Sequence, residues 1–337
     1  MNYLLGIDIG GTKCAVTLGI QQIVSSAEAT AHGLQILAKT SFATPFNAPD
    51  ATIEQIVQTC QALVREQGFA ISDIAAIGIS CGGPLDSRQG LILSPPNLIG
   101  WDAVPIVDRL EKQLGCRPSL QNDANACAVA EWKYGAGRGL QNLVFLTFGT
   151  GMGSGLILNG QLYSGTNDMA GEIGHIRLET TGPVGYGKAG SFEGFCSGGG
   201  IAQLAATMVL EKLQMGEKVA FCASPDALAT LDAKTVGEFA EAGDPLAQAI
   251  YQRSGQYLGR GLAILIDILN PQAIIIGSIF ARRMNLLWAA ASAVLEQEAL
   301  GLASKVCQVL PAALGEQIGD YAALAVAAYA LETRSQR

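Results

Sequence analysis

The stretch that decides the fold of this chain is Asp8-Ile9-Gly10-Gly11-Thr12-Lys13. Apolar residues 4–7 precede it and residues 14–18 follow it, so the pattern predicts a strand, a tight glycine turn and a second strand. Adjacent glycines let backbone N–H groups approach an anion because no Cβ stands in the way. The threonine and lysine add donors, and the aspartate could order a metal ion through water. The stretch predicts a triphosphate-binding turn, although an ordinary Gly-Gly hairpin would use the same residues.

A second glycine-rich stretch, Thr147-Phe148-Gly149-Thr150-Gly151-Met152-Gly153-Ser154-Gly155, has the same surroundings. Apolar residues 143–146 lead into it and residues 156–158 lead out of it. Strand, glycine turn and strand therefore occur twice, which indicates two related halves rather than a solenoid. A nucleotide held between such halves would be gripped by a turn from each. Neither stretch is a Walker A loop, because GxxxxGK[ST] occurs nowhere in the chain.

The composition is that of a compact globular protein. The 337 residues fit two ordinary domains or one large one, and apolar residues make up 49%. Only 15% of residues are charged, which excludes a disordered or coiled-coil chain. A net charge of −8 without a basic cluster argues against a nucleic-acid partner. The N-terminus lacks a leader pattern and no apolar run reaches the ~20 residues of a membrane span, so we expect a cytoplasmic chain with no membrane partner.

Cysteine and histidine are not arranged as metal ligands. The eight cysteines form no CxxC pair, and there are only two histidines, so local spacing predicts no zinc framework. Most cysteines lie in apolar runs, where they act as small hydrophobic residues. The GxGxxG match at 185–190 has no strand before it and no long helix after it, so it does not predict a dinucleotide site.

Strands and helices alternate in the α/β manner along the chain. The pattern predicts strands at 3–9, 13–19, 34–41, 74–80, 118–121 and 273–276, and a strand–turn–strand unit at 142–158. It predicts helices at 52–67, 104–114, 124–134, 199–213, 245–268 and 319–333, with a loop-rich stretch at 160–198.

Asp123 lies where a strand meets a helix, in Asn122-Asp123-Ala124-Asn125. It could be the helix N-cap, a very common use of aspartate, or a general base beside the nucleotide. Farther along, Glu172 and His175 share a glycine-bearing segment, and Glu193 stands between aromatic residues, an odd place for an unpaired charge. A solvated loop would explain the first two. Alternatively, Glu172, His175 and Glu193 would form, together with Asn122 and Asp123, a ring of donors and acceptors suited to sugar hydroxyls.

Taken together, these motifs resemble the ROK family of repressors, open reading frames and sugar kinases, within the actin-like ATPase superfamily. The similarity covers most of the first 200 residues in family order. The stretches that carry it are Asp8–Lys13, Pro96–Trp101, Asn122–Asn125 through Glu131, Phe148–Gly155 and Glu172–His175.

The resemblance implies an α/β fold of two RNase H-like (actin-like ATPase) domains with an interdomain cleft that holds ATP. The N-terminal small domain would comprise 1–121 plus 317–337, with the last helix packed back on it. The C-terminal large domain would comprise 122–316. The family also implies a homodimer.

The same resemblance implies roles for individual residues, with Asp123 as the catalytic base. The sugar would be held by Gly83, Asn97, Asn122, Asp123, Glu172, His175 and Glu193. ATP would be held by Asp8, Gly10, Gly11, Thr12, Lys13, Thr147, Gly149, Thr150, Gly151, Gly277 and Ser278, with Mg²⁺ bound through ATP and ordered by Asp8.

One segment departs from the family pattern. Most members carry a CxCGxxGCxE zinc loop after the histidine, whereas residues 182–193 here contain no cysteine and keep only Glu193. Cys196 and His175 alone cannot fill a tetrahedral site, so we expect no structural zinc. Packing of Tyr186 and Phe192, or the substrate itself, would have to order this loop instead.

The sequence therefore predicts an ATP-dependent sugar kinase (ATP:hexose phosphotransferase), with glucose as the first choice of substrate. An N-acetylhexosamine, mannose, fructose or allose stays open, as does polyphosphate as the donor. A catalytically silent sugar-binding or regulatory protein of the same family is the alternative of another class. A repressor would need an N-terminal helix-turn-helix, for which the seven residues before the first motif leave no room. A glycosidase would leave both glycine turns unexplained.

Overall fold

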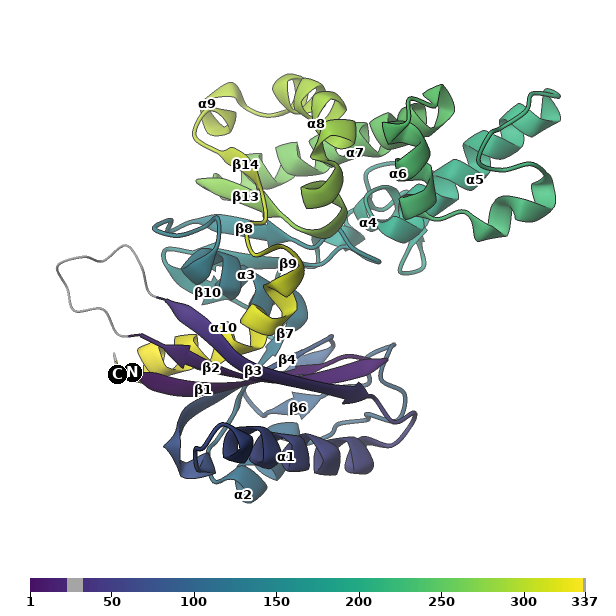
Figure 1. The fold of residues 1–337 in the computed structure, drawn as a ribbon. Helices are drawn as coiled ribbons and strands as arrows, with labels where there is room; N and C mark the ends of the chain where they lie inside the picture. The colour runs from purple at the N-terminus through teal and green to yellow at the C-terminus, as the bar shows by residue number, and fades with distance from the viewer. Residues whose placement is uncertain (23–32, 336–337) are drawn as a thin grey trace. The chain divides into compact units, whose positions relative to one another are not determined.

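The computed structural model describes residues 1–22 and 33–335. Figure 1 shows the elements along the chain. The strands are β1 (Asn2–Ile9), β2 (Lys13–Gln21), β3 (Leu34–Ala43), β4 (Ile74–Cys81), β5 (Leu85–Asp86), β6 (Leu91–Ile92), β7 (Ser119–Asn122), β8 (Leu143–Leu146), β9 (Ser154–Leu158), β10 (Gln161–Tyr163), β11 (Val184–Gly185), β12 (Lys188–Ala189), β13 (Ala273–Ile276) and β14 (Gln308–Pro311). The helices are α1 (Pro49–Glu66), α2 (Ile106–Leu114), α3 (Asp123–Tyr134), α4 (Phe192–Phe195), α5 (Gly198–Gln214), α6 (Ala233–Glu241), α7 (Pro245–Leu269), α8 (Ser278–Glu298), α9 (Gly301–Ser304) and α10 (Ile318–Ser335).

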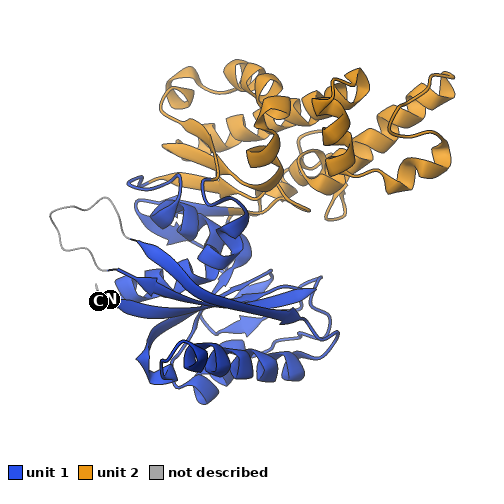
Figure 2. Ribbon diagram, in the orientation of Figure 1, with its two compact units in different colours: residues 1–141, 155–170, 313–337 blue, residues 142–154, 171–312 orange. Residues whose placement is uncertain are grey.

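The strands form two five-stranded sheets, with the orders β3-β2-β1-β4-β7 and β10-β9-β8-β13-β14, and two small two-stranded ribbons. Figure 2 colours the two compact units into which the chain divides. Unit 1 comprises 1–141, 155–170 and 313–337, and unit 2 comprises 142–154 and 171–312.

The first sheet brings the first glycine turn to the ends of two neighbouring strands. β1 and β2 are antiparallel and join at Ile9–Cys14, so residues 10–12 form the turn between them. β1, β4 and β7 are parallel, with Asp8 beside Ser80 and Cys81 beside Asn122. Because carboxyl ends of parallel strands share one edge, polar residues from three strands meet there, as in open α/β sheets that bind ligands.

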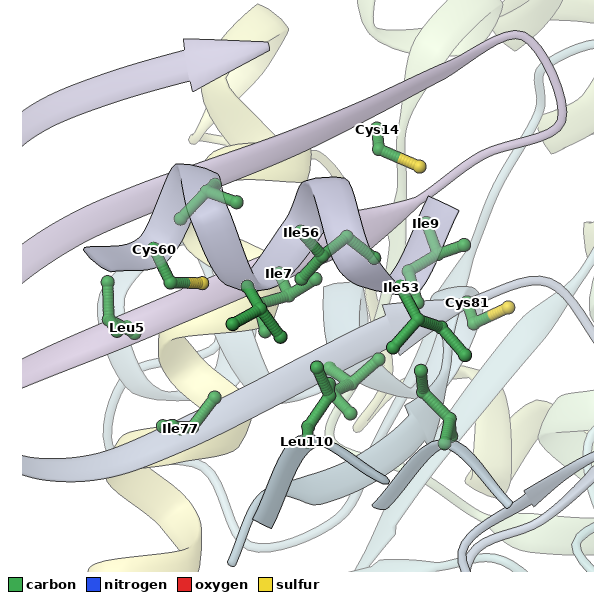
Figure 3. Close-up of a cluster of buried hydrophobic side chains, with 14 of the residues drawn as sticks. Leu5, Ile7, Ile9, Cys14, Ile53, Ile56, Cys60, Ile77, Cys81 and Leu110 are labelled. Atoms are coloured by element: carbon green, nitrogen blue, oxygen red, sulfur yellow. The ribbon is translucent and has the colours of Figure 1, made fainter. Parts of the chain in front are cut away.

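Each face of this sheet is buried by helices of unit 1. Residues 5, 7 and 9 of β1 point to one face because side chains alternate along a strand. There they pack with α1, whose buried residues recur at helical spacing, including Ile53, Ile56 and Cys60 (Figure 3). On the other face α10 packs closely, since a methyl group at Gly6 would lie 2.8 Å from the backbone nitrogen of Leu324. The prediction that the last helix packs on the N-terminal part of the chain is thereby confirmed.

Unit 2 is built on the parallel strands β8, β13 and β14 and on a layer of long helices. α7 and α8 pack tightly, because Gly255 and Gly259 let the backbone of α8 approach to about the distance of direct contact. A methyl group at Gly255 would lie 2.5 Å from the carbonyl oxygen of Leu287. The close packing of α8 therefore explains why α7, an otherwise apolar helix, has glycines on the side that faces α8.

The structure contains elements that the sequence pattern did not indicate. α6, β14 and the 21-residue helix α8 were not predicted. No side chain caps α8, and its backbone departs from helical geometry at Arg283. Tertiary packing against α7, rather than local signals, selects this helix.

The compact units differ from the predicted domain boundaries in residues 122–141, 155–170 and 313–316. These segments group with unit 1 because α3 packs on α10 and the backbone N–H of Leu162 donates to the Tyr329 hydroxyl at 3.2 Å. The buried carboxylate of Glu131 accepts hydrogen bonds from the backbone nitrogens of Ala136 and Leu314, which fixes the chain where it returns to unit 1. The predicted division at residue 121 stays a prediction.

The GxGxxG match at 185–190 forms β11, a turn and β12, which confirms that it is no dinucleotide-binding βαβ unit. Within the described part of the chain, none of the helices is both long and apolar enough to cross a bilayer.

Candidate active site

The first glycine turn is tight and packed against a neighbouring loop. The backbone N–H of Gly10 donates to the carbonyl oxygen of Lys13 at 3.1 Å. A methyl group at Gly11 would overlap the carbonyl oxygen of Asn97. Neither glycine has a positive φ, so close packing, and not a left-handed backbone, requires glycine here. The side chains of Thr12 and Lys13 are exposed and free to meet a ligand.

The predicted sugar-binding residues of unit 1 lie next to this turn. Asn97 contacts Gly11, and its side-chain oxygen lies 3.5 Å from a methyl group placed at Gly82. A methyl group placed at Gly83 would lie 3.1 Å from the amide nitrogen of Asn122. The structure thus brings Asn97, Gly83 and Asn122 into one group beside the glycine turn, from three separate parts of the sequence.

Asn122, and not Asp123, is the N-cap of α3. Its side-chain oxygen accepts a hydrogen bond from the backbone nitrogen of Ala124 at 2.9 Å, while Asp123 is the first helical residue. The N-cap interpretation of Asp123 is therefore wrong. Asp123 also accepts from Ala124 through one oxygen, at 2.8 Å, and its side chain remains exposed to solvent. A carboxylate at the positive end of a helix, with a second oxygen available, suits a proton acceptor.

Asp8 and Asp123 influence each other electrostatically. Burial, the charge of Asp123 and the more distant Asp320 raise the pKa of Asp8 to about 6, against a hydrogen bond from Ser80 and the charge of Lys39. The surrounding protein limits hydration of Asp123 and raises its pKa, against the helix N–H groups that favour the charged form. Perturbed carboxylates beside a glycine turn are typical of a functional site.

Two side chains that affect Asp8, those of Ser80 and Lys39, were not predicted from the sequence. Ser80 is buried near the end of β4. A polar residue near the end of an otherwise apolar strand is the sequence signal that could have identified it. Lys39 on β3 pairs with Asp320 on α10 at 2.5 Å. No sequence signal links residues 281 positions apart, so only the fold reveals this pair.

The second glycine turn is held by its own backbone and by a glutamate. The backbone N–H of Thr147 donates to Gly153 O at 2.9 Å, and Gly149 N donates to Gly151 O at 3.1 Å. The backbone nitrogen of Met152 donates to the carboxylate of Glu193 at 2.9 Å. This bond explains why a charged residue stands between aromatic side chains, and it ties a predicted sugar ligand to a predicted phosphate-binding turn.

Other predicted residues of unit 2 surround this turn. Ser278 opens α8 with a φ of 54°, and its hydroxyl lies 3.4 Å from a methyl group placed at Gly149. Gly277 precedes it, and its backbone N–H donates to Leu146 O at 2.9 Å. The N-terminus of α5 adjoins the same turn, because Gly198 N donates to Gly149 O at 2.7 Å. The structure therefore groups the predicted nucleotide residues of unit 2.

Glu172 precedes a short 3-10 turn, Ile173–His175, and His175 is its last residue; both side chains are exposed. A methyl group at Gly174 would lie 3.3 Å from Cβ of Glu193, so this turn packs against the glutamate. The predicted sugar ligands of unit 2 are thus neighbours.

With this geometry in view, the comparisons with known proteins identify the family. The profile of the ROK family matches residues 4–329. The chain belongs to the ROK family. The predicted recognition is confirmed, and so is the fold class of two α/β domains of the RNase H-like, actin-like ATPase kind. The cleft predicted between those domains stays a prediction.

Relatives of this ROK protein include a glucokinase and an N-acetylmannosamine kinase. A glucokinase from Halalkalibacterium halodurans is 34% identical over 82% of this chain and 79% of its own length. An N-acetylmannosamine kinase from Escherichia coli is 34% identical over 81% of both chains. The crystal structure of a ROK family glucokinase from Streptomyces griseus, in complex with glucose and AMPPNP, matches with a TM-score of 0.72 and 29% identity. That match covers 97% of this chain and all of the other.

The residues of this ROK protein fit ATP and Mg²⁺ but not zinc. The exposed donors of Thr12 and Lys13 beside a glycine turn suit phosphates, and the carboxylate of Asp8 suits a hard cation. Among the described residues, no three of His, Cys, Asp and Glu gather as metal ligands. Cys196 is buried, its thiol donates to Ser254 O at 3.4 Å, and burial raises its pKa, so it is a structural thiol.

Proposed function

We propose that this ROK protein is an ATP-dependent sugar kinase that transfers the γ-phosphoryl group of ATP to a hexose hydroxyl, most directly of glucose. The observation that carries the proposal is the grouping in unit 1. Asp8 near the end of β1 and Asp123 directly after β7 lie at the same edge of the sheet, with β4 between the two strands, and the glycine turn packed on Asn97 adjoins Asp8. Glucokinase relatives at 34% identity and below support glucose as the acceptor.

In the proposed reaction Asp123 accepts the proton of the attacking hydroxyl. Asn122, Asn97 and the backbone at Gly83 orient the sugar from unit 1, and Glu172, His175 and Glu193 bind it from unit 2. The backbone N–H groups of the two glycine turns, with Thr12 and Lys13, hold the phosphates. Mg²⁺, when bound, neutralises phosphate charge, and Asp8 would hold it through water. Phosphoryl transfer depends on such positioning and charge stabilisation more than on covalent chemistry.

A second acceptor is favoured by one comparison. The N-acetylmannosamine kinase of Escherichia coli is as similar in percentage identity as the glucokinase of Halalkalibacterium halodurans. An N-acetylhexosamine is therefore the alternative substrate. A catalytically silent sugar-binding protein is the alternative of another class. The position of Asp123, which suits a general base, argues against this alternative. The homodimer, the cytoplasmic location and the lack of structural zinc are further predictions.

The test is an ADP-release assay, coupled to NADH oxidation, with a panel of hexoses. Glucose, mannose, fructose, allose, N-acetylglucosamine and N-acetylmannosamine are each supplied with ATP and Mg²⁺, and polyphosphate replaces ATP in a parallel series read by product formation. We expect glucose to give the highest kcat/KM. A higher value for an N-acetylhexosamine would transfer the assignment to the alternative. ADP release that no sugar stimulates would refute the kinase proposal.

A further inference from the structure

A small hairpin contacts His175 where the family pattern would place a zinc loop. It consists of β11, the turn Tyr186-Gly187 and β12, and we call it the Tyr186 hairpin. The rings of Tyr186 and His175 pack edge to face, with centroids 5.5 Å apart and an interplanar angle of 72°. The ammonium of Lys188 donates a hydrogen bond to the carbonyl oxygen of His175 at 2.7 Å. Side chain and backbone of the histidine thus each have a partner in the hairpin.

Backbone bonds fasten the hairpin to the segment that carries His175. The nitrogens of Leu178 and Glu179 both donate to Gly190 O, at 2.9 and 3.1 Å. The guanidinium of Arg177 donates to Ala189 O at 2.8 Å. Phe192, fully buried, follows the hairpin and packs against α7 at Gly261, where a methyl group would overlap its ring. The expected packing of Phe192 is confirmed, whereas Tyr186 is largely exposed and ordering of the loop by the substrate stays a prediction.

Tyr186 occupies a conformation that tyrosine disfavours. Its φ is 44° and that of Gly187 is 75°, so the hairpin has a two-residue turn with both central residues left-handed. Asn-Gly and Asp-Gly are the preferred pairs for such a turn, because glycine has no Cβ and the short polar side chains of Asn and Asp tolerate the left-handed region better than a bulky side chain does. The hairpin of β9 and β10 uses the preferred pair, with Asn159 at 53° and Gly160 at 69°.

The tyrosine gains little from burial, since it is 70% exposed. A residue that is both locally strained and poorly buried points to a role outside the turn, and strain of this kind collects at ligand-binding sites. The contact of Tyr186 with His175 supplies that role. We propose that Tyr186 and Lys188 are positioning residues that hold His175 in the orientation that binds the sugar. The proposal rests on the proposed function of His175 as a sugar ligand.

The physical basis is restriction of the histidine before the sugar binds. An exposed imidazole on a loop samples several rotamers, and the edge of an aromatic neighbour disfavours those that lose the contact. The bond from Lys188 fixes the peptide group that carries the ring. Less ordering is then required when the sugar binds, and the affinity rises accordingly.

The test replaces Tyr186 with the residue that the matched hairpin uses. Tyr186→Asn keeps a favourable turn and removes the ring, so we expect an unchanged or higher melting temperature. The sugar KM should rise about 2- to 12-fold, the range expected from the loss of one aromatic pair, with kcat nearly constant. Asn159→Tyr is the matched control, because it places the strained Tyr-Gly pair in the other hairpin. It should lower the melting temperature and leave the sugar KM unchanged.

A spectroscopic measurement tests the positioning without any enzyme activity. The chain has two histidines, so a ¹H–¹³C spectrum shows two sets of imidazole signals, assigned with His175→Asn. We expect Tyr186→Asn to shift the His175 signal, because the ring current of the tyrosine is lost. Lys188→Met, which keeps the stem and removes the donor, should also move the His175 signal and raise the sugar KM.

Unchanged His175 signals and an unchanged sugar KM in folded Tyr186→Asn would overturn the proposal. If the wild-type chain phosphorylates no sugar while Tyr186→Asn still shifts the His175 signal, the contact stands and the kinase proposal fails. Shifted signals with an unchanged sugar KM, in an active enzyme, would show that the contact exists but does not position the histidine for binding.

Discussion

The two glycine turns follow the same pattern of strand, turn and strand, but their surroundings differ. The turn at residues 10–13 in unit 1 displays an exposed lysine, and next to it stands Asp8, whose pKa is raised to about 6. The turn at 147–153 in unit 2 displays no cationic side chain. It bonds to itself and to the carboxylate of Glu193, a predicted sugar ligand.

This difference indicates a division of labour. In the proposed reaction unit 1 would supply charge and the proton acceptor, because Asp8, Asp123 and Lys13 all belong to it. Unit 2 would supply binding and orientation through backbone groups, Glu193 and His175. The repeated sequence pattern thus predicts the same backbone conformation twice. The chemical properties of each turn depend on the residues around it. Substitutions in unit 1 should therefore change turnover or its pH dependence, and those in unit 2 should change affinity.

The largest expected effect is that of Asp123→Asn in unit 1. Asparagine is nearly isosteric and can still accept from Ala124, so the fold and sugar affinity should persist, and Asn122 remains as the cap. It cannot accept the proton, and general-base catalysis is worth about 10²–10⁴-fold in rate. Steady-state kcat of a folded variant checks this. A kcat above about a tenth of the wild-type value would exclude the base role.

The free energy of unfolding of Asp8→Asn tests whether the surroundings of the first glycine turn disfavour the charged form of Asp8. Since the folded-state pKa of Asp8 lies above its ordinary value of 3.8, stability contributed by the neutral form is lost as pH rises through about 6. The shift corresponds to no more than about 3 kcal/mol, because Asp8 is only partly shielded from solvent.

Asp8→Asn should therefore unfold at higher denaturant concentration than the wild type at pH 7.5, and the two should converge near pH 4. Urea titrations at both pH values measure this. A variant that is less stable than the wild type at pH 7.5 would contradict the electrostatic account.

The pH dependence of activity should also belong to unit 1. In the proposed reaction both Asp8 and Asp123 act as carboxylates, and the pKa of each is raised. Since the pKa of Asp8 is about 6, kcat/KM for the sugar should fall by about tenfold per pH unit below that value as Asp8 protonates, and more steeply where Asp123 protonates as well. A pH–rate profile measures the fall, with enzyme stability monitored at each pH. Activity that stays level down to pH 5 would contradict the raised pKa values.

His175→Asn tests the comparison from the side of unit 2. Loss of one hydrogen bond to the sugar should raise its KM about 2- to 12-fold and leave kcat within about twofold of wild type. Initial rates over a range of sugar concentrations separate the two constants. A fall in kcat of a hundredfold with an unchanged KM would assign the histidine to the reaction step instead.

The smallest expected effect is that of zinc removal. Because residues 182–193 offer no cysteine, the purified protein should contain no stoichiometric zinc, and chelation followed by restored Mg²⁺ should leave activity intact. Elemental analysis checks the content. About one tightly bound zinc per chain would contradict the prediction.

Local signals carried the prediction of the first sheet and its turn, because residues 4–18 combine apolar runs with adjacent glycines. They also located Asn122 and Asp123 but could not decide which residue caps α3, since both types cap helices equally well. The hydrogen bond from Ala124 to Asn122 settles that point.

Other features depend on tertiary packing and were out of reach of the sequence. The helix α8 has no side-chain cap and is irregular at Arg283, and it packs against the glycines of α7. The bond between Met152 and Glu193 joins residues 41 positions apart, and the contact of Tyr186 with His175 depends on a turn that tyrosine rarely makes. Such pairs leave no periodic or capping pattern in the sequence.

The most direct test of the division of labour measures kcat and glucose affinity for Asp123→Asn and His175→Asn side by side. Calorimetric titration with glucose gives the affinity, and the coupled ADP-release assay on the same preparations gives kcat. The account predicts that Asp123→Asn binds glucose as the wild type does and barely turns over, whereas His175→Asn binds it more weakly and turns over at saturation. Equal losses of affinity and kcat in both variants would contradict it.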